Sequence, residues 1–208
     1  MTDAEELGLS PRAFARQDDG DDLGFYAPPR LVTHIDGGAV AALTALYRRL
    51  LPADARILDL MSSWVSHLPE DVAYPDIVGH GMNADELAAN PRLTRWFVQD
   101  LNREPTVPET DGAFDAILVC VGVQYLQRPL TVFRDVRRML RPGGSVVVSF
   151  SNRCFPTKAV AIWRALDAQG HAGLVRLYLE KAGFGAIEAH MLADGRSSDP
   201  LVAIAGRA

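Results

Sequence analysis

The segment that most constrains the fold is Arg56–Pro69, in which a short apolar strand passes through Asp59 and leads directly into a turn of small residues. In doubly wound α/β sheets, a turn of this kind after the first strand holds a nucleotide-like ligand. Such turns are usually rich in glycine, because glycine lets the backbone approach the ligand and adopts positive φ without steric cost. Met61, Ser63 and Val65 occupy the glycine positions here. We therefore predict a ligand-binding turn that is built from unusual residues.

The rest of the chain alternates apolar strands with amphipathic helices. Buried parallel strands are typically short and apolar throughout. Segments of this kind are predicted at 57–60, 76–80, 95–98, 114–121 and 145–150, and a terminal hairpin is predicted from 185–191 and 201–205. This order predicts one α/β domain with a largely parallel sheet.

Helix ends and the domain boundary follow from local composition. Asp36 is predicted to cap a helix that ends before Pro52, because the apolar residues between them recur at helical spacing. Pro129 suits the first turn of a second helix, which the turn at 141–144 ends. Residues 1–24 include Asp-Asp-Gly-Asp-Asp and few large apolar groups, so we expect a flexible leader before a single domain at 25–208. This leader could stay solvated or close over the domain.

Composition argues against several classes of protein. The 208-residue chain has a net charge of −5, which disfavours a general electrostatic grip on nucleic acid. Cys120 and Cys154 fit neither a disulfide framework nor a metal-ligand spacing, so no metal site is predicted. No apolar run approaches the roughly 20 residues that span a bilayer, and no signal peptide is recognisable. We expect a cytoplasmic protein without nucleic-acid or membrane partners; monomer and homodimer both remain open.

Two segments, together with the order of elements, resemble the class I S-adenosylmethionine-dependent methyltransferases of type 11. One is Phe-Asp-Ala-Ile-Leu-Val-Cys-Val at 114–121, and the other is 136–144, which ends in Arg-Pro-Gly-Gly before a valine-rich strand. The resemblance covers residues 25–206. It implies a Rossmann-like three-layer α/β/α sandwich with a seven-stranded, mostly parallel sheet whose last strand is antiparallel. It also implies S-adenosyl-L-methionine as the cofactor, although the Pro-Gly-Gly segment marks the fold rather than the chemistry.

The resemblance implies cofactor contacts at the strand ends. Asp59 matches the carboxylate near the methionine amino group, and Asp100 matches the one that accepts a hydrogen bond from the adenine amino group. The family's ribose-binding carboxylate after the second strand is missing, but the Asn83 amide could bind the ribose or could instead cap the next helix. The other implied contacts are Tyr26 as a lid, Met61, Ser62 and Ser63 beneath the methionine, Gly81, Met82 against adenine, Leu101 beside Asp100, and Cys120 and Val121 near the sulfonium.

A general base is needed only if the methyl acceptor must lose a proton. Histidine suits this role because its pKa lies near neutrality. The candidates are His34, His67 and His80. His67 is favoured because it follows the turn after the first strand. Each of the three could instead be a packed or surface residue. Tyr125 is a further catalytic candidate. Substrate contacts are predicted for Arg30, Trp64, Gln124, Asn152 and Arg153.

The predicted activity is in-line methyl transfer to a small molecule, which depends mainly on positioning in a dry site. The chain lacks an Asn-Pro-Pro-Tyr element after strand 114–121, which argues against nucleobase methylation. The alternative is a catalytically altered methyltransferase-fold protein that serves as a binding or regulatory module or uses the cofactor for another reaction. The missing ribose carboxylate favours this alternative. A nicotinamide-dependent oxidoreductase fits less well, because the first turn lacks Gly-x-Gly-x-x-Gly.

Overall fold

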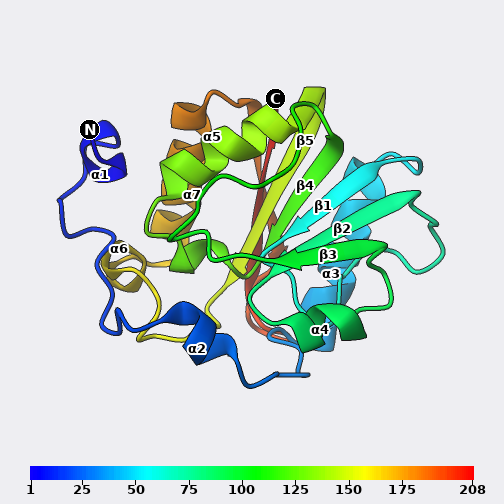
Figure 1. The fold of residues 1–208 in the computed structure, drawn as a ribbon, viewed down its shortest axis with the longest axis horizontal. Coiled ribbons are helices and arrows are strands. Elements are labelled where there is room, and N and C mark those ends of the chain that lie inside the picture. The colour runs from blue at the N-terminus through cyan, green and yellow to red at the C-terminus, as the bar shows by residue number, and fades with distance from the viewer.

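A seven-stranded sheet forms the centre of the computed structural model, which describes residues 1–208 (Figure 1). The strand order is β3-β2-β1-β4-β5-β7-β6. Strands β1 to β5 are parallel, whereas β7 runs antiparallel to both β5 and β6. The predicted Rossmann-like fold class is thereby confirmed. The strands are β1 (Arg56–Leu60), β2 (Asp76–Gly81), β3 (Arg95–Val98), β4 (Phe114–Cys120), β5 (Leu140–Ser151), β6 (Gly185–Ala193) and β7 (Leu201–Arg207).

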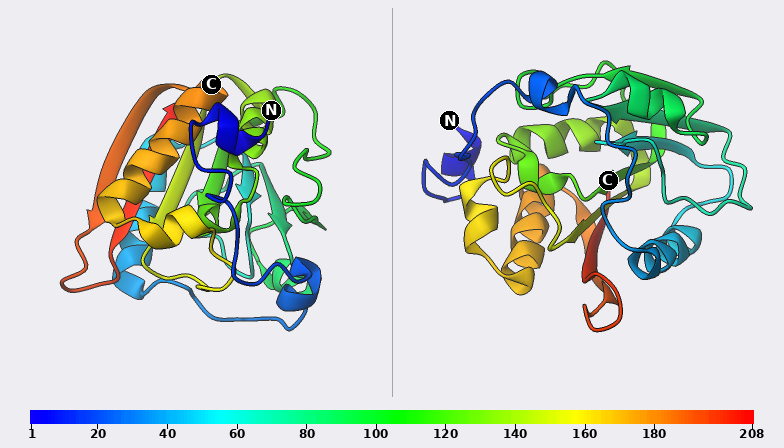
Figure 2. Two further views of the ribbon diagram at one scale, coloured as in Figure 1. Left: turned by 90° about the vertical axis from the view of Figure 1, so that its left-hand side faces the viewer. Right: turned by 90° about the horizontal axis from the view of Figure 1, so that it is seen from below.

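Helices cover both faces of the sheet. Helix α3 shares a buried core with β1 and β4 on one face, while α5 and α7 pack together on the other (Figure 2). Asp36 caps α3 by accepting a 2.9 Å hydrogen bond from the Ala39 amide, and Pro129 begins α5, both as predicted. The helices are α1 (Asp3–Glu6), α2 (Asp22–Tyr26), α3 (Gly37–Leu50), α4 (Ala84–Ala89), α5 (Pro129–Met139), α6 (Ala161–Ala165) and α7 (Ala168–Ala182), with a 3₁₀ turn, η1, at Val123–Tyr125.

The connection between β1 and β2 departs from the expected alternation of strand and helix. Residues 61–75 form an irregular loop. The loop is rich in serine and contains Pro69 and Pro75, and these residue types disfavour helix. The side chains of Thr44 and Arg92 instead donate hydrogen bonds to its carbonyl groups. The turn after β1 therefore lacks the helix N-terminus that often supplies backbone N–H groups to a ligand.

The N-terminal segment, expected to be a flexible leader, packs against the domain. The Asp3 carboxylate accepts hydrogen bonds of 2.7 and 3.0 Å from the hydroxyl and amide of Thr131 in α5. Phe14 is buried in the core, and the carbonyl groups on either side of it accept hydrogen bonds from amides of α6. The segment has few large apolar residues, and most of its attachments join polar groups that are far apart in the sequence. Local composition therefore gave no sign of this packing.

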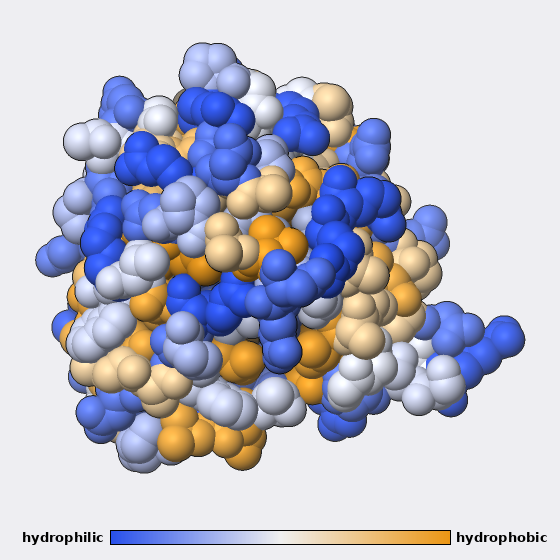
Figure 3. Space-filling model, turned by 90° about the vertical axis from the view of Figure 1, so that its right-hand side faces the viewer, coloured by the Kyte–Doolittle hydropathy of each residue, from blue (hydrophilic) through white to orange (hydrophobic).

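The surface mixes apolar and polar side chains. On the side that lies to the right in Figure 1, apolar patches are interrupted by hydrophilic groups (Figure 3). Two of the most exposed large apolar residues, Leu31 and Val32, precede α3. None of the helices combines the length and the apolar character required to cross a membrane.

Candidate active site

A cavity of about 520 Å³ opens at the carboxyl ends of the parallel strands. This is the edge at which such sheets bind ligands. Residues after β1, β2 and β4 line it, together with the segment before α3 and the loop after β5. The lining includes most of the predicted site residues: Tyr26, Arg30, His34, Asp59, Met61, Ser62, Ser63, Trp64, His67, Gly81, Met82, Asn83, Asp100, Leu101, Cys120, Val121, Tyr125 and Arg153.

Two residues predicted to contact the substrate lie outside this lining. Gln124 is turned into the protein, where its Nε2 donates a 2.8 Å hydrogen bond to the Val121 carbonyl. Asn152 is exposed beyond β5, and its Oδ1 accepts a hydrogen bond from the Ser151 hydroxyl. Both were predicted because they lie close to the end of a strand. Successive residues point in different directions there, so proximity to a strand end does not by itself bring a side chain to the cavity.

Asp59 lines the cavity and is only 5% exposed. Its Oδ2 accepts hydrogen bonds from the hydroxyl groups of Ser62 at 2.7 Å and Ser66 at 2.5 Å. Burial raises the pKa of Asp59 above its usual value, against the lowering effect of these hydrogen bonds. A positively charged group in the cavity would therefore stabilise the ionised carboxylate.

The backbone is strained where β1 and β4 meet the cavity. Met61 follows β1 with a φ of 61°, and Val121 follows β4 with a φ of 50°. Left-handed φ is unfavourable for a residue with a Cβ, most of all for a β-branched one. Met61 thus keeps the backbone conformation that glycine usually supplies at this turn, and its side chain lies against Gly122. Strain of this kind is concentrated at functional sites.

His80 holds this turn in place. Its Nδ1 accepts a 3.1 Å hydrogen bond from the Met61 amide, which leaves the ring proton on Nε2. The Nε2–H then donates to the Gln99 carbonyl at 2.9 Å. The Ser62 amide also donates to the His80 carbonyl at 2.6 Å. His80 therefore joins the ends of β1, β2 and β3, and the proposal that it acts as a base is wrong for this geometry because both ring nitrogens are occupied.

His80 is expected to stay neutral well below the usual histidine pKa. Burial lowers the pKa of His80 to about 4, against the raising effect of the hydrogen bond to Gln99. Because the unfolded chain takes up this proton near pH 6.5, the group should lower the stability of the fold as pH falls from about 6.5 to about 4. Ring nitrogen chemical shifts should show the neutral Nε2–H tautomer at about pH 5.5. A protonated ring at that pH would contradict this assignment.

Asn83 is held by three side-chain hydrogen bonds within the protein. Its Oδ1 accepts a 3.0 Å hydrogen bond from the Glu86 amide and so caps α4, which was one of its two predicted roles. Its Nδ2 donates to the carbonyl groups of Tyr26 and Ala27, both at 2.9 Å. Both amide hydrogens are used in this way. Asn83 therefore attaches the N-terminal segment to α4 and has no spare N–H donor, while its Oδ1 keeps a second acceptor position.

Glu86 also lines the cavity, and the sequence analysis missed it. Its Oε1 accepts a 2.7 Å hydrogen bond from the Arg30 amide, and its Oε2 accepts one of 2.5 Å from the Ser63 hydroxyl. Acidic residues are common in the first turn of a helix, where they complement the helix dipole. The position of Glu86 in the sequence was therefore uninformative. Glu86 thus places a carboxylate at the cavity from α4, the helix after β2. The carboxylate that the family has at the end of β2 is missing in this chain.

Arg30 lies in a group of aromatic rings beside the cavity. Its guanidinium carbon is 4.9 Å from the centre of the Phe25 ring, 5.7 Å from Tyr26 and 5.3 Å from Phe155. The guanidinium donates hydrogen bonds to the carbonyl groups of Phe25 and Pro28. Cation–π contacts and backbone acceptors thus orient a positive group that is not neutralised by a bonded carboxylate.

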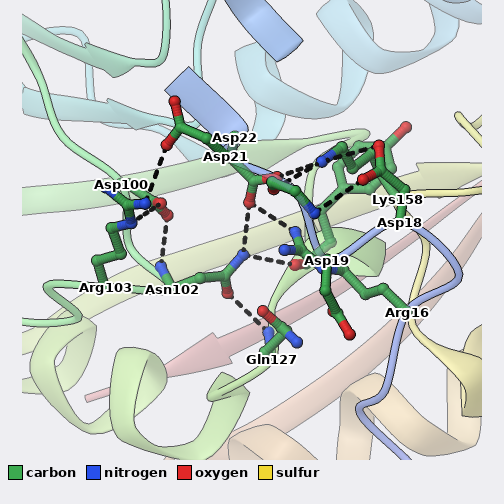
Figure 4. Close-up of polar contacts among 12 residues, drawn as sticks. Arg16, Asp18, Asp19, Asp21, Asp22, Asp100, Asn102, Arg103, Gln127 and Lys158 are labelled. Atoms are coloured by element: carbon green, nitrogen blue, oxygen red, sulfur yellow. Dashed lines mark hydrogen bonds and ion pairs between the residues drawn. The ribbon is translucent and has the colours of Figure 1, made fainter. Parts of the chain in front are cut away.

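Charged residues attach the N-terminal segment to the edge of the cavity (Figure 4). The Asp22 carboxylate lines the cavity and contacts Arg16 at 2.6 Å and Lys158 at 2.9 Å. Lys158 also lies 3.1 Å from Asp18, and its side chain is only 1% exposed. The Nδ2 of Asn102 donates a 3.3 Å hydrogen bond to Asp22 and so links this network to the loop after β3.

That loop also contains Asp100, the residue predicted to contact adenine. Asp100 is 8% exposed, and its Oδ1 accepts a 2.9 Å hydrogen bond from the Asn102 amide. Its Oδ2 lies 3.7 Å from the Arg103 guanidinium, and Leu101 is buried beside it. The carboxylate is therefore held at the cavity by contacts within the protein. Its contact with adenine stays a prediction.

His34 and His67, two of the predicted proton acceptors, line the cavity. Desolvation by the surrounding protein lowers the pKa of His34, although its surface is exposed, and of the half-buried His67, and the proximity of His34 lowers that of His67 further. Both rings are thus neutral at neutral pH and able to accept a proton. Burial raises the pKa of Cys120 and of Tyr125 to about 12, so neither is ionised at neutral pH. The Tyr125 hydroxyl accepts a 2.9 Å hydrogen bond from the Phe155 amide.

Trp64 and Arg153 lie on other parts of the lining and already have partners. Trp64 Nε1 donates a 3.0 Å hydrogen bond to the Val32 carbonyl. The Arg153 guanidinium lies 2.7 Å from the Asp199 carboxylate, and the Asp199 amide donates to the Asp36 carboxylate at 2.6 Å. Arg153 is therefore held by the loop between β6 and β7. A substrate would have to share or replace that contact.

The fold and the position of the cavity define a Rossmann-like α/β protein that binds its ligand at the carboxyl ends of parallel strands. A family model described as a methyltransferase domain matches residues 59–148. Residues 59–148 thus match a methyltransferase domain, and the chain has the fold of the class I S-adenosylmethionine-dependent enzymes, so the resemblance found in its sequence is confirmed. No curated protein matches the chain.

Solved structures of methyltransferases share this fold. An S-adenosylmethionine-dependent methyltransferase from Mesorhizobium loti is 18% identical, with a TM-score of 0.58 over 83% of this chain and 100% of that one. A possible histamine N-methyltransferase from Thermotoga maritima is 15% identical, with a TM-score of 0.58 over 82% of this chain and 87% of that one. A methyltransferase from Aquifex aeolicus is 13% identical, with a TM-score of 0.61 over 82% of this chain and 90% of that one. At these identities the likeness concerns the fold.

Proposed function

We propose that the protein is an S-adenosylmethionine-dependent methyltransferase that acts on a small-molecule acceptor. The observation that carries the proposal is the buried Asp59 carboxylate beside the cavity of a methyltransferase domain. S-adenosylmethionine supplies a methyl group on a positively charged sulfur and also has a positively charged amino group. A cation of this kind would stabilise the ionised form of Asp59, which burial otherwise disfavours.

The other lining residues fit the remaining parts of the cofactor. The cavity volume of about 520 Å³ lies within the range of small-molecule sites. Asp100 would accept a hydrogen bond from the adenine amino group, and the Arg30 guanidinium would pair with the methionine carboxylate. We assign the ribose to Glu86 in place of Asn83. A carboxylate has about four acceptor positions, so Glu86 can keep its two present hydrogen bonds and still accept another.

Catalysis by this site depends on positioning and on exclusion of water. The strained ends of β1 and β4 place Met61 and Val121 at the cavity, where they would fix the approach of the acceptor. His67 and His34 are neutral and close enough to influence each other, so either can take a proton from an acceptor that must lose one. An acceptor that needs no deprotonation would leave both histidines as lining groups.

Asp59→Asn is expected to weaken S-adenosylmethionine binding about 10-fold or more, because a hydrogen bond to a charged group contributes roughly 1.5–3 kcal/mol. Asparagine keeps the volume and an acceptor for Ser62 and Ser66 but removes the charge. Isothermal titration measures the effect. The matched control is Asp115→Asn, because Asp115 bonds to Arg56 and Arg141 at the opposite end of the strands. Wild-type affinity in Asp59→Asn would refute the assigned role.

The sequence arguments support the small-molecule acceptor and the cytoplasmic location as parts of this proposal. No observation favours the alternative of a binding or regulatory module. Its main support was the missing ribose carboxylate, and Glu86 offers an acidic group at the same cavity.

A further inference from the structure

Val121, the residue after β4, has a backbone conformation that depends on its surroundings. Its φ of 50° is unfavourable for any residue with a Cβ, and most of all for a β-branched one. Such a conformation persists only where nearby contacts fix it. Two hydrogen bonds do so here. The Val121 amide donates to the Ser149 carbonyl at 2.8 Å, and the Val121 carbonyl accepts a bond of 2.8 Å from Gln124 Nε2.

Packing alone does not account for a glutamine at position 124. Gln124 lies in η1, is 1% exposed and stands outside the cavity lining. Its Oε1 has no partner in hydrogen-bonding geometry. A buried polar atom without a partner destabilises a fold, and methionine, which has a similar length, would fill the same space without that penalty. The bond from Nε2 to the Val121 carbonyl is the contact that requires glutamine.

The turn after β4 also contacts the turn after β1. A Cβ at Gly122 would lie 2.9 Å from the Met61 Cβ and 3.0 Å from its Sδ. No side chain fits there, so glycine lets the backbone pack directly against Met61. Met61 is itself strained, with a φ of 61°, and its amide is held by His80. A change of φ at Val121 would therefore move Gly122 and disturb Met61.

We propose that Gln124 is a positioning residue. Its hydrogen bond to the Val121 carbonyl holds the turn after β4 and, through Gly122 and Met61, the turn after β1 in the shape that lines the cavity. The inference rests on the proposed function, because these turns line the cavity that would hold the cofactor. It gives Gln124 a part in the site that requires no contact with a ligand.

The test combines Gln124→Met with Val121→Gly. Gln124→Met removes the donor, and isothermal titration should show an S-adenosylhomocysteine dissociation constant raised about 5-fold or more. Glycine adopts positive φ without strain. In a Val121→Gly background, Gln124→Met should therefore change the constant by less than about 2-fold. A packing role would weaken binding equally in both backgrounds, because the two substitutions would then act independently.

Gln127→Met is the matched control. Gln127 Nε2 also donates to a backbone carbonyl, that of Phe14 at 3.3 Å, but neither residue lines the cavity. This variant should bind S-adenosylhomocysteine like the wild type. If Gln124→Met does not fold, Gln124→Asn takes its place in the same comparison, because asparagine is one methylene shorter and cannot reach Val121.

Wild-type affinity for S-adenosylhomocysteine in the Gln124 variant would overturn the inference and leave the proposed function standing. An equal loss in both backgrounds, or a loss as large in Gln127→Met, would overturn it as well. A wild-type protein that does not bind S-adenosylhomocysteine would overturn the inference and the proposed function together.

Discussion

Lys158→Ala is expected to lower the free energy of unfolding by roughly 1.5–3 kcal/mol, the usual contribution of a hydrogen bond to a charged group, because Asp22 keeps Arg16 as a partner and Asp18 is partly exposed. The Lys158 ammonium lies between Asp22 and Asp18 at 2.9 and 3.1 Å and faces the Phe25 ring at 5.0 Å. Burial alone would lower the pKa of Lys158, but its hydrogen bonds to the two carboxylates outweigh that effect and raise it. The ammonium is therefore charged, and its removal leaves Asp22 with Arg16 as its only ion-pair partner.

The change can be measured by urea unfolding, with Arg134→Ala as the matched control. Arg134 also attaches the N-terminal segment, through an exposed ion pair with Glu6. Exposed pairs usually contribute about 0–1 kcal/mol. A loss in Lys158→Ala no larger than in Arg134→Ala would mean that the network in Figure 4 does not hold the segment against the domain.

Gly81→Ala is expected to disrupt the turn after β1, residues 61–63. A Cβ at Gly81 would lie 2.5 Å from the Ser62 carbonyl oxygen, which belongs to the backbone and cannot move aside without shifting the turn. Overpacking of this kind typically costs about 1–3 kcal/mol. The same shift would disturb the hydrogen bonds between His80 and the turn, so we expect both a lower thermal midpoint and a loss of S-adenosylmethionine affinity of at least about 10-fold.

Gly173→Ala provides the comparison for Gly81→Ala. Gly173 lies inside α7, and a Cβ there would meet open space. Alanine at a compatible helical position usually stabilises by about 0.4–1 kcal/mol. Wild-type S-adenosylmethionine binding in Gly81→Ala, together with an unchanged thermal midpoint, would show that the turn can move without affecting the site.

The strands and the position of the cavity could be predicted because they depend on local patterns. Most of the parallel strands are short apolar runs, although β3 is largely exposed and β5 is 12 residues long and begins at Leu140, before the predicted turn. The residues that follow such strands meet at one edge of the sheet. The roles of Asp59 and Asp100 were implied by the resemblance to the methyltransferase family, which has carboxylates at the ends of the first and third strands. Side-chain direction beyond a strand end depends on backbone details that sequence does not reveal. This explains why Gln124 points into the protein and Asn152 towards solvent.

The contacts that sequence could not predict are the long-range polar ones. Asp3 and Thr131 are 128 residues apart, so nothing near residue 3 indicates that the N-terminal segment is attached. Glu86 looks like an ordinary acidic residue in a first helical turn. Tyr47 occupies an apolar position in the repeat of α3, and only the fold shows that the residue lines the cavity.

The most direct test of the proposed function is isothermal titration of the wild-type protein with S-adenosylmethionine and with S-adenosylhomocysteine. A methyltransferase must bind the first and normally retains affinity for the second. We predict micromolar dissociation constants for both, which correspond to about −8 kcal/mol. The absence of binding by either compound up to about a millimolar, or about −4 kcal/mol, would contradict the proposal that this cavity holds the cofactor.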